Sequence, residues 1–209
     1  MDIKTFKTVG GKLPSNIAIL LRGPTGVGKS HVVYQIAKQL ELPVIDRRLA
    51  QMTEGDILGL PSLEDGTTRF LPVDWVKRAS TEPVCLFLDE LNRASLEVQQ
   101  CAFQLVLDRE INGIKLHKET RVFAAINEGS EYKGASTLGA ALMRRFFALE
   151  FVPDFDIWMS WARTSGIHGN VISFFESTGS KHWNYTDRRE AGSQYPSPAS
   201  WHRLSDQLH

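Results

Sequence analysis

One stretch of this sequence has the residue types and spacing of a phosphate-binding loop. It reads Gly23-Pro24-Thr25-Gly26-Val27-Gly28-Lys29-Ser30 and lies between an apolar run and a helical pattern. Glycines let the backbone curl until successive N–H groups face inward, and the following helix adds its positive dipole end. In this pattern the lysine reaches the β- and γ-phosphates of a nucleotide, and the serine hydroxyl binds Mg²⁺. A glycine-rich turn that only begins a helix would not need Lys29 and Ser30 in this register, so we predict a nucleoside triphosphate site.

The acidic pair Asp89-Glu90 would supply the second half of such a site. It follows the apolar run 84–88 directly. One acidic residue at the end of a buried strand can hold Mg²⁺, while its neighbour orients and deprotonates the attacking water. We therefore assign metal binding to Asp89 together with Ser30, and water activation to Glu90. The alternative is an acid pair that caps the next helix, and the phosphate-binding pattern upstream makes it the weaker interpretation.

Two further positions could act on the phosphates. Asn127 ends the apolar run 121–126 and could hydrogen-bond the γ-phosphate or the attacking water from a neighbouring strand. A lone asparagine is more often a helix or turn cap. Arg144 or Arg145 could cross a subunit boundary and neutralise charge in the transition state. The spacing favours equally a solvated basic end of a helix.

Composition and charge restrict the class of protein. The 209 residues include 42% hydrophobic and 23% charged residues, which is ordinary for a globular protein. The formal net charge of zero gives no support for nucleic acid or a membrane as partner. No run approaches the ~18 apolar residues of a membrane span, and residues 1–12 lack the apolar core of a signal peptide. We expect a cytoplasmic protein in which Cys85 and Cys101 are small core residues.

Strand patterns alternate with helical patterns along the chain, which predicts an α/β fold with a parallel sheet flanked by helices. We expect strands at 17–22, 44–46, 84–88, 121–126 and 146–152. We expect helices at 33–40, 98–105, 139–145, 157–162 and 198–208, and a further helix that begins at 171. Pro153 is the expected domain boundary. It separates an α/β nucleotide-binding domain at 1–152 from a small helical lid at 153–209, which we expect to be truncated or minimal.

Local signals give more detailed expectations. Gly10-Gly11 predicts a turn in the leader, and Asn112-Gly113 predicts a hairpin because both residues accept the positive φ of a type I′ turn. Residues 49–76 lack a regular pattern, and 176–198 are polar and predicted as a loop. Either Asn92 or Ser95 could cap the helix that follows.

Taken in order, these motifs resemble the AAA+ ATPases, and specifically their MoxR branch. The resemblance rests on the loop 23–30, on Leu-Phe-Leu-Asp-Glu-Leu-Asn-Arg-Ala at 86–94, on Ala-Ala-Ile-Asn-Glu at 124–128 and on Leu-x-Arg-Arg-Phe at 142–146. It covers residues 15–152 well and the lid weakly. It implies ATP and Mg²⁺ as cofactors, a homo-oligomeric ring, usually a hexamer, Asn127 as the sensor-1 residue, and Arg145 as the arginine finger with Arg144 in reserve. The stretch 51–76 would be the helix-2 insertion and the Asn112-Gly113 hairpin the pre-sensor-1 insertion, both on the substrate side of the ring.

The sequence departs from this family at Ser197-Pro198-Ala199-Ser200-Trp201. This stretch resembles the Ser-Pro-Arg-x-Trp segment known as sensor 2, but Ala199 stands where the arginine is expected. Arg203 lies one helical turn further on and could substitute for it. Without this arginine, we expect weaker coupling between the nucleotide state and the motion of the lid.

The function expected from this resemblance is Mg²⁺-dependent ATP hydrolysis by a chaperone-like remodelling motor that acts on a protein client or adaptor. A first alternative is a motor acting on nucleic acid in restriction or replication. The basic and aromatic residues at 181–189 could form a single-strand surface, although a solvated loop is the better interpretation. A second alternative is an ATP-gated assembly or adaptor module with little turnover. The client and the number of subunits in the ring do not follow from the sequence.

Overall fold

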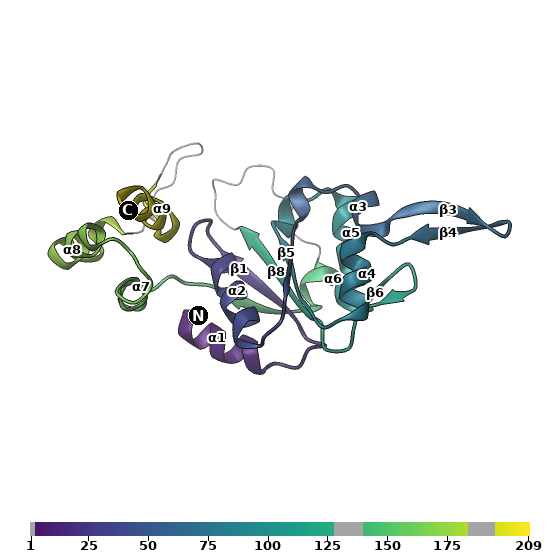
Figure 1. Ribbon diagram of the computed structural model, residues 1–209, viewed down its shortest axis with the longest axis horizontal. Helices are drawn as coiled ribbons and strands as arrows, with labels where there is room; N and C mark the ends of the chain where they lie inside the picture. The colour runs from purple at the N-terminus through teal and green to yellow at the C-terminus, as the bar shows by residue number, and fades with distance from the viewer. Residues whose placement is uncertain (1–2, 128–139, 184–194) are drawn as a thin grey trace.

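Five parallel strands form the central sheet of the computed structural model, which describes residues 3–127, 140–183 and 195–209 (Figure 1). Every neighbouring pair in this sheet is parallel. From one edge to the other, the strands are β2 (Val44–Arg48), β5 (Cys85–Asp89), β8 (Arg121–Asn127), β1 (Ala18–Gly23) and β9 (Phe146–Glu150). The predicted α/β class is confirmed, although β9 ends before the predicted Val152.

The register brings the ends of three strands to one edge of the sheet. Gly23, at the end of β1, pairs with Asn127 at the end of β8. Strand β5 pairs with the other side of β8 and ends at Asp89. Ligands of open α/β sheets bind at this carboxyl edge, so the fold places the predicted site residues where a ligand would lie.

Helices cover both faces of the sheet (Figure 1). They are α1 (Ile3–Lys12) and α2 (Lys29–Gln39) on one face, and α4 (Asp74–Thr81) and α5 (Leu96–Leu107) on the other. Leu21 of β1 packs in the hydrophobic cluster with α1 and α2, while Leu20 packs in the cluster with α4 and α5. Successive side chains of a strand point to opposite faces, which explains why the central strands β1, β5 and β8 are almost continuously apolar and buried.

The predicted turn at Gly10-Gly11 is wrong, because both glycines lie within α1. Gly10 is buried, and a Cβ atom there would lie 3.0 Å from Cδ1 of Ile36 on α2. A Cβ atom on Gly11 would meet nothing within 4 Å. Gly10 therefore serves close packing of α1 against α2 rather than a turn.

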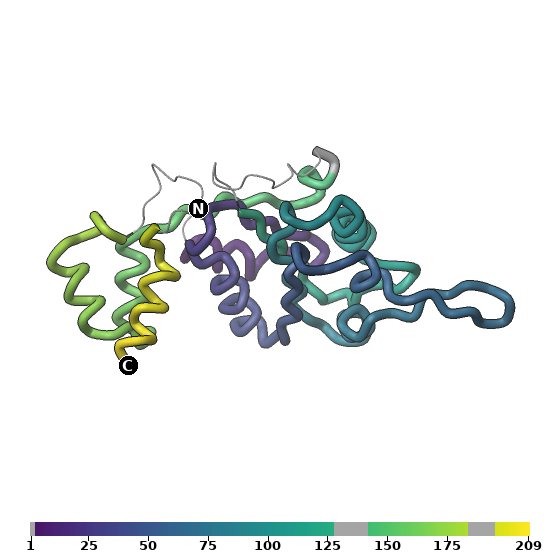
Figure 2. The backbone as a smooth tube through the Cα atoms, turned by 90° about the horizontal axis from the view of Figure 1, so that it is seen from above, coloured from purple at the N-terminus to yellow at the C-terminus, as the bar shows by residue number. Residues whose placement is uncertain are grey.

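The stretch without a regular pattern contains short elements and a projecting hairpin. These are η1 (Leu49–Gln51), α3 (Gly55–Leu58), and the antiparallel pair β3 (Leu60–Glu64) and β4 (Thr67–Leu71). Figures 1 and 2 show the hairpin extending from the end of the molecule opposite the C-terminal helices. Its side chains include Leu63, which is 77% exposed, and Leu60, which is 69% exposed.

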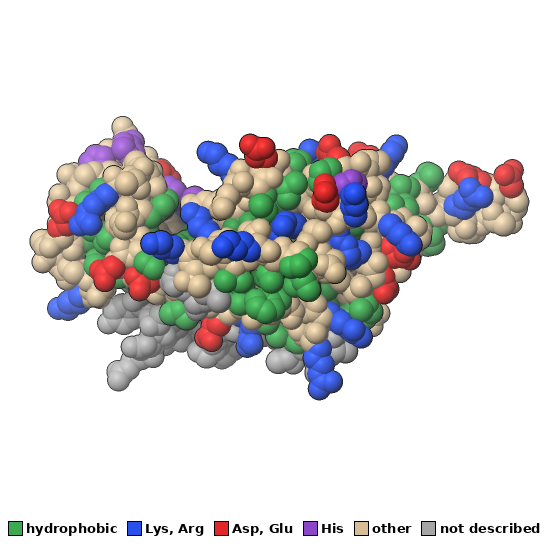
Figure 3. Space-filling model, turned by 90° about the horizontal axis from the view of Figure 1, so that it is seen from below, with side chains coloured by type: hydrophobic (Ala, Val, Ile, Leu, Met, Phe, Trp, Pro, Cys, Tyr) green, Lys and Arg blue, Asp and Glu red, His purple; other side chains and the backbone are tan. Residues whose placement is uncertain are grey.

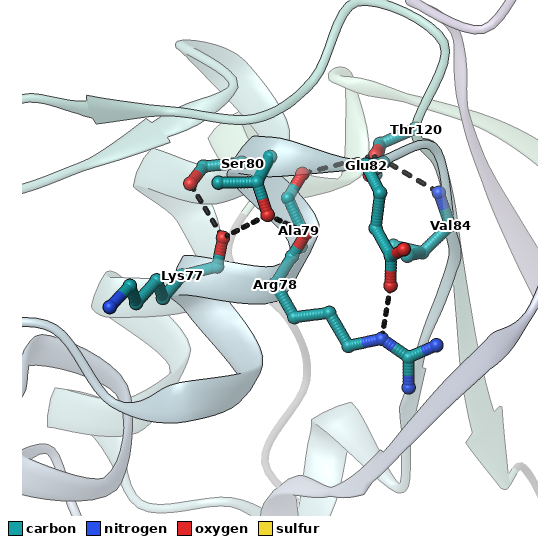
Figure 4. A network of polar contacts seen from close by, with 8 residues as sticks. Lys77, Arg78, Ala79, Ser80, Glu82, Val84 and Thr120 are labelled. Atoms are coloured by element: carbon teal, nitrogen blue, oxygen red, sulfur yellow. Dashed lines mark hydrogen bonds and ion pairs between the residues drawn. The ribbon is translucent and has the colours of Figure 1, made fainter.

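A buried hydroxyl ties α4 to the start of β5 (Figure 4). Thr120 Oγ1 accepts a hydrogen bond from the N–H of Val84 at 3.3 Å and donates to the carbonyl of Ala79 at 3.1 Å. Thr120 is completely buried. Arg78 and Glu82 form an ion pair at the exposed side of the same turn. Since β5 ends at Asp89, this network helps to fix the strand that carries the acidic pair.

The hairpin at Asn112-Gly113 is confirmed. Strands β6 (Glu110–Ile111) and β7 (Ile114–Lys115) flank the two residues, whose φ angles are 49° and 80°. Helix α6 (Ala140–Met143) is shorter than the predicted helix at 139–145, because Arg144 and Arg145 form a turn before β9.

Three helices with their own hydrophobic cluster follow the sheet: α7 (Phe155–Ala162), α8 (Gly169–Thr178) and α9 (Pro198–Leu208). They group at one end of the molecule in Figures 1 and 2. The predicted loop at 176–198 is wrong at its start, since α8 continues to Thr178 and η3 (Gly179–His182) follows it. The separate cluster supports the predicted division at 1–152 and 153–209, which stays a prediction.

The surface carries charges of both signs. On the face seen in Figure 3, Lys and Arg side chains are scattered with Asp and Glu side chains among them. This distribution agrees with the formal net charge of zero. Within the described parts of the chain, no helix is both long enough and apolar enough to cross a membrane.

Candidate functional site

The loop between β1 and α2 folds around the amino group of Lys29. Nζ donates hydrogen bonds to the carbonyl oxygens of Gly23 at 2.8 Å and Pro24 at 2.6 Å. The lysine is only 6% exposed. Gly26 and Gly28 have φ angles of 75° and 98°, a region that glycine adopts readily and other residues rarely do. The glycines of the pattern are therefore required by the backbone of the loop.

Asn127 joins this loop to the end of β8. Its Oδ1 accepts a hydrogen bond from Nζ of Lys29 at 2.8 Å. Asn127 is itself buried at 7% exposure. The side chain of Asn127 thus contacts the lysine that the sequence predicts to bind phosphate, and this contact, rather than a helix cap, is what its amide oxygen makes.

Asn92 makes a contribution to this site that the sequence did not predict. Its Nδ2 donates to the carbonyl of Asn127 at 2.9 Å, and its Oδ1 accepts the N–H of Asn127 at 3.3 Å. Ser95, rather than Asn92, caps α5, because Ser95 Oγ accepts the N–H of Val98. The position of Asn92, shortly after a buried strand, could have indicated this role. A buried side-chain amide there needs partners for both its donor and its acceptor.

Ser30 and Asp89 meet at the start of α2. Ser30 Oγ donates to Oδ2 of Asp89 at 3.2 Å, and the N–H of Glu90 donates to Oδ1 of Asp89 at 2.8 Å. Burial raises the pKa of Asp89 above its ordinary value, and these two hydrogen bonds oppose the rise. A hydroxyl and a partly desolvated carboxylate are oxygen donors of the kind Mg²⁺ prefers, and a cation would stabilise this carboxylate. The pair therefore fits the predicted metal.

Glu90 has a backbone conformation that non-glycine residues seldom adopt. Its φ angle is 55° and its ψ angle 35°, in the left-handed region. Such a conformation costs on the order of 1 kcal/mol and is common at functional sites. The Oε1 atom lies 3.3 Å from Nη1 of Arg93, and the side chain is 25% exposed. Glu90 is thus adjacent to Asp89 yet remains in contact with water.

Arg144 and Arg145 do not join the other predicted residues within one chain. Both are exposed and precede β9, whose first residue Phe146 pairs with Ala18 at the start of β1. The loop follows the other end of β1, at Gly23. With about 3.3 Å per residue, the two ends of β1 are roughly 16 Å apart. The arginines lie at the amino edge of the sheet, opposite Lys29.

A cavity of about 580 Å³ lies next to the loop. It is bounded by the loop and α2 on one side, and by α1, α7, α9 and the segment after β9 on the others. Val27, Gly28 and the aromatic rings of Trp158 and Trp161 line it. Its size and its mostly apolar wall suit a flat organic group attached to phosphates held by the loop.

Three rings in edge-to-face contact connect α2 with α7 and α9. The ring centroids of His31 and Trp161 are 5.5 Å apart, and those of Trp161 and His202 are 5.6 Å apart, both with edge-to-face geometry. Burial lowers the pKa of His31, and the neighbouring His202 and Lys7 lower it further. The neutral form of His31 is therefore favoured in the wall of the cavity.

The sequence offered the segment 181–189 as a surface for single-stranded nucleic acid. Residues 184–189 lie outside the described residues. Trp183 is 5% exposed and packs against Phe155 and Trp158. Its ring is therefore core, and it cannot stack on a base without unpacking the C-terminal helices. In the described parts of the chain, no group of three or more His, Cys, Asp or Glu residues could hold a metal ion.

Residues 18–146 match the family described as AAA domain (dynein-related subfamily). Two solved structures with a similar fold are a point mutant of RuvB from Thermotoga maritima and NtrX from Brucella abortus in complex with ATP. The match to RuvB has a TM-score of 0.55 and 18% sequence identity, and the aligned region covers 99% of this chain and 58% of the RuvB chain. The match to NtrX has a TM-score of 0.59 and 17% sequence identity, and the aligned region covers 99% of this chain and 47% of the NtrX chain. The chain thus spans about half the length of these two proteins. No curated protein matches its sequence.

Proposed function

The chain belongs to the AAA domain family, dynein-related subfamily, and from this premise we propose that it hydrolyses ATP with Mg²⁺. The observation that carries the proposal is the meeting of Lys29 with Asn127 and of Ser30 with Asp89 at one edge of the sheet. Groups suited to phosphate, to metal and to the attacking water then lie side by side. The structure of NtrX, which has a similar fold, contains ATP, and this supports ATP as the nucleotide.

Each residue has a proposed role. The backbone N–H groups of the loop 23–30, other than at Pro24, which has none, and the amino group of Lys29 would hold the phosphates. Ser30 and Asp89 would hold Mg²⁺, which neutralises charge on the phosphates. Glu90 would orient and deprotonate the attacking water, and Asn127 would contact it or the γ-phosphate. The adenine ring would occupy the cavity lined by Val27 and Trp161.

The remaining charge on the γ-phosphate would be neutralised by a neighbouring subunit. Arg145, with Arg144 in reserve, lies at the opposite edge of the sheet from Lys29 and is exposed. An arginine so placed can act on a phosphate only of another chain. This separation supports a homo-oligomeric ring, and we propose a hexamer of the MoxR type.

We propose a protein as the partner of this ring. The β3–β4 hairpin exposes Leu60, Leu63, Phe70 and Leu71, the last two at 43% and 52%. Exposed apolar side chains suit a protein client or adaptor, whereas nucleic acid is bound mainly through basic residues. On the one face that Figure 3 shows, charges of both signs are mixed, and the formal net charge is zero, so neither favours a nucleic-acid motor.

The test compares steady-state ATP hydrolysis by wild type, Lys29→Ala and Lys38→Ala. Lys38 is an exposed lysine near the end of the same helix and serves as the matched control. We expect Lys29→Ala to lose measurable turnover and Lys38→Ala to retain it. Equal rates in all three proteins would contradict the site. ATP binding without turnover in wild type would instead support an ATP-gated adaptor.

A further inference from the structure

The first turn of α9 lies directly against the tip of the phosphate-binding loop. The N–H of Ala199 donates a hydrogen bond to the carbonyl oxygen of Gly26 at 3.0 Å. A Cβ atom on Gly26 would lie 2.8 Å from Oγ and 3.2 Å from Cβ of Ser197. The two segments are more than 160 residues apart in the sequence. Their contact joins the C-terminal helices to the loop through backbone atoms.

This turn of α9 is held in place from both ends. Ser197 and Ser200 form a reciprocal capping box, in which each side chain accepts the backbone N–H of the other. Trp201 anchors the helix against Phe175 and donates from Nε1 to the carbonyl of Trp183 at 3.1 Å. The donor at Ala199 is therefore part of a rigid element.

The bond to Gly26 fixes the direction of the next N–H group. A peptide unit is planar and trans, so its C=O and N–H point in opposite directions. With the carbonyl of Gly26 directed at Ala199, the N–H of Val27 points away from α9. Glycine allows a wide range of φ and ψ angles, so without this bond the Gly26–Val27 peptide unit has more freedom to rotate.

We propose that the N–H of Ala199 and the side chain of Ser197 position the Gly26–Val27 peptide for phosphate binding. They are positioning groups, because the bond acts on the loop and need not touch the nucleotide. This inference rests on the proposed function. It also explains how the lid is tied to the nucleotide site although Ala199 stands where the resembling family has arginine, since the backbone N–H needs no particular side chain.

The experiment measures ADP binding with Mg²⁺ by calorimetry in wild type, Ala199→Pro, Ala199→Gly and Ser205→Ala. Proline removes the N–H, and at this position in the first helical turn no hydrogen bond within the helix depends on that group. Glycine keeps the N–H. Ser205→Ala removes the hydrogen bond from the N–H of His168, 2.8 Å long, and so loosens α9 away from the loop.

We expect Ala199→Pro to bind ADP about fivefold more weakly, as suits the loss of one hydrogen bond, and the other two variants to stay within about twofold of wild type. Unchanged affinity in Ala199→Pro would overturn the inference. An equal loss in Ser205→Ala would overturn it too, because the contact would then only support the lid. If wild type itself does not bind ADP, the proposed function fails instead.

Far-UV circular dichroism and tryptophan fluorescence check that Ala199→Pro keeps the C-terminal helices folded. If they unfold, Ser197→Gly replaces it, because glycine is an adequate N-cap while the atoms that pack against Gly26 are removed. Weaker ADP binding by this variant, with its helices intact, is the expected result. Binding equal to that of wild type would overturn the inference.

Discussion

The amino group of Lys29 lies 2.8 Å from Oδ1 of Asn127, so the segment that follows the loop 23–28 and the end of β8 meet through one hydrogen bond. Asn92 in turn holds the backbone of Asn127 on both its N–H and its carbonyl. Three residues from three separate segments thus form a chain of contacts across the carboxyl edge of the sheet. This chain fixes the position of Asn127 relative to Lys29.

Replacement of Asn92 by alanine would leave the N–H and the carbonyl of Asn127 without these partners. We expect a loss of about 1–3 kcal/mol in the free energy of unfolding, measured by urea denaturation. ATP turnover should also fall, because Asn127 would no longer be fixed. Asn170→Ala is the control, since Asn170 is exposed on α8. Unchanged stability of Asn92→Ala would contradict the role assigned to Asn92.

How much of this site can be predicted from the sequence depends on how far apart along the chain the interacting residues lie. The roles suggested for Lys29, Ser30 and Asp89 came from short motifs, since each motif lies at the end of an apolar strand. Asn92 and the contact of Ala199 with Gly26 are different, because each depends on segments that only the folded chain brings together. The role of Gly10 could not be predicted for the same reason, since its packing against Ile36 leaves no local pattern in the sequence.

The raised pKa of Asp89 predicts a pH-dependent effect on stability. A carboxyl group whose pKa is higher in the folded state loses stability as the pH rises from its unfolded value of about 4 through the folded value. At neutral pH, Asp89→Asn should therefore raise the melting temperature of the nucleotide-free protein, and the gain should shrink as the pH falls toward about 4. A lower melting temperature at neutral pH would contradict this expectation.

The same variant should respond less to the metal. Asparagine keeps the shape of the side chain but lacks the negative charge that favours Mg²⁺. We expect Mg²⁺ to strengthen ADP binding clearly in wild type and only weakly in Asp89→Asn. An equal effect of Mg²⁺ on both proteins would show that the metal is held elsewhere.

The two glycines of α1 should behave in opposite ways. Gly10→Val would force a branched side chain against Ile36 and should destabilise the fold by about 1–3 kcal/mol. Gly11→Ala meets no neighbour within 4 Å and should stabilise it by up to about 1 kcal/mol through helix propensity. Thermal unfolding of both variants measures the contrast, and equal effects would show that α1 does not pack closely against α2.

The proposed ring can be tested by mixing subunits. If Arg145 acts on the nucleotide of a neighbour, activity should fall non-linearly as Arg145→Ala subunits are added to wild type. Such an arginine can contribute roughly 10³-fold or more to the rate. Arg163→Ala is the control, since Arg163 is an exposed arginine of the C-terminal helices that pairs with Glu176. A linear fall would indicate that each chain works alone.

Glu90 is proposed to activate the water that cleaves ATP bound by the loop. The direct measurement is the identity of the nucleotide that remains bound after wild type, Glu90→Gln and the control Glu119→Gln are incubated with ATP and Mg²⁺. Glu119 is exposed and lies just before β8, at the far end of that strand from Asn127. We predict bound ATP in Glu90→Gln, and conversion to ADP in wild type and in Glu119→Gln. Conversion to ADP by Glu90→Gln at the rate of wild type would contradict the role of Glu90 in hydrolysis.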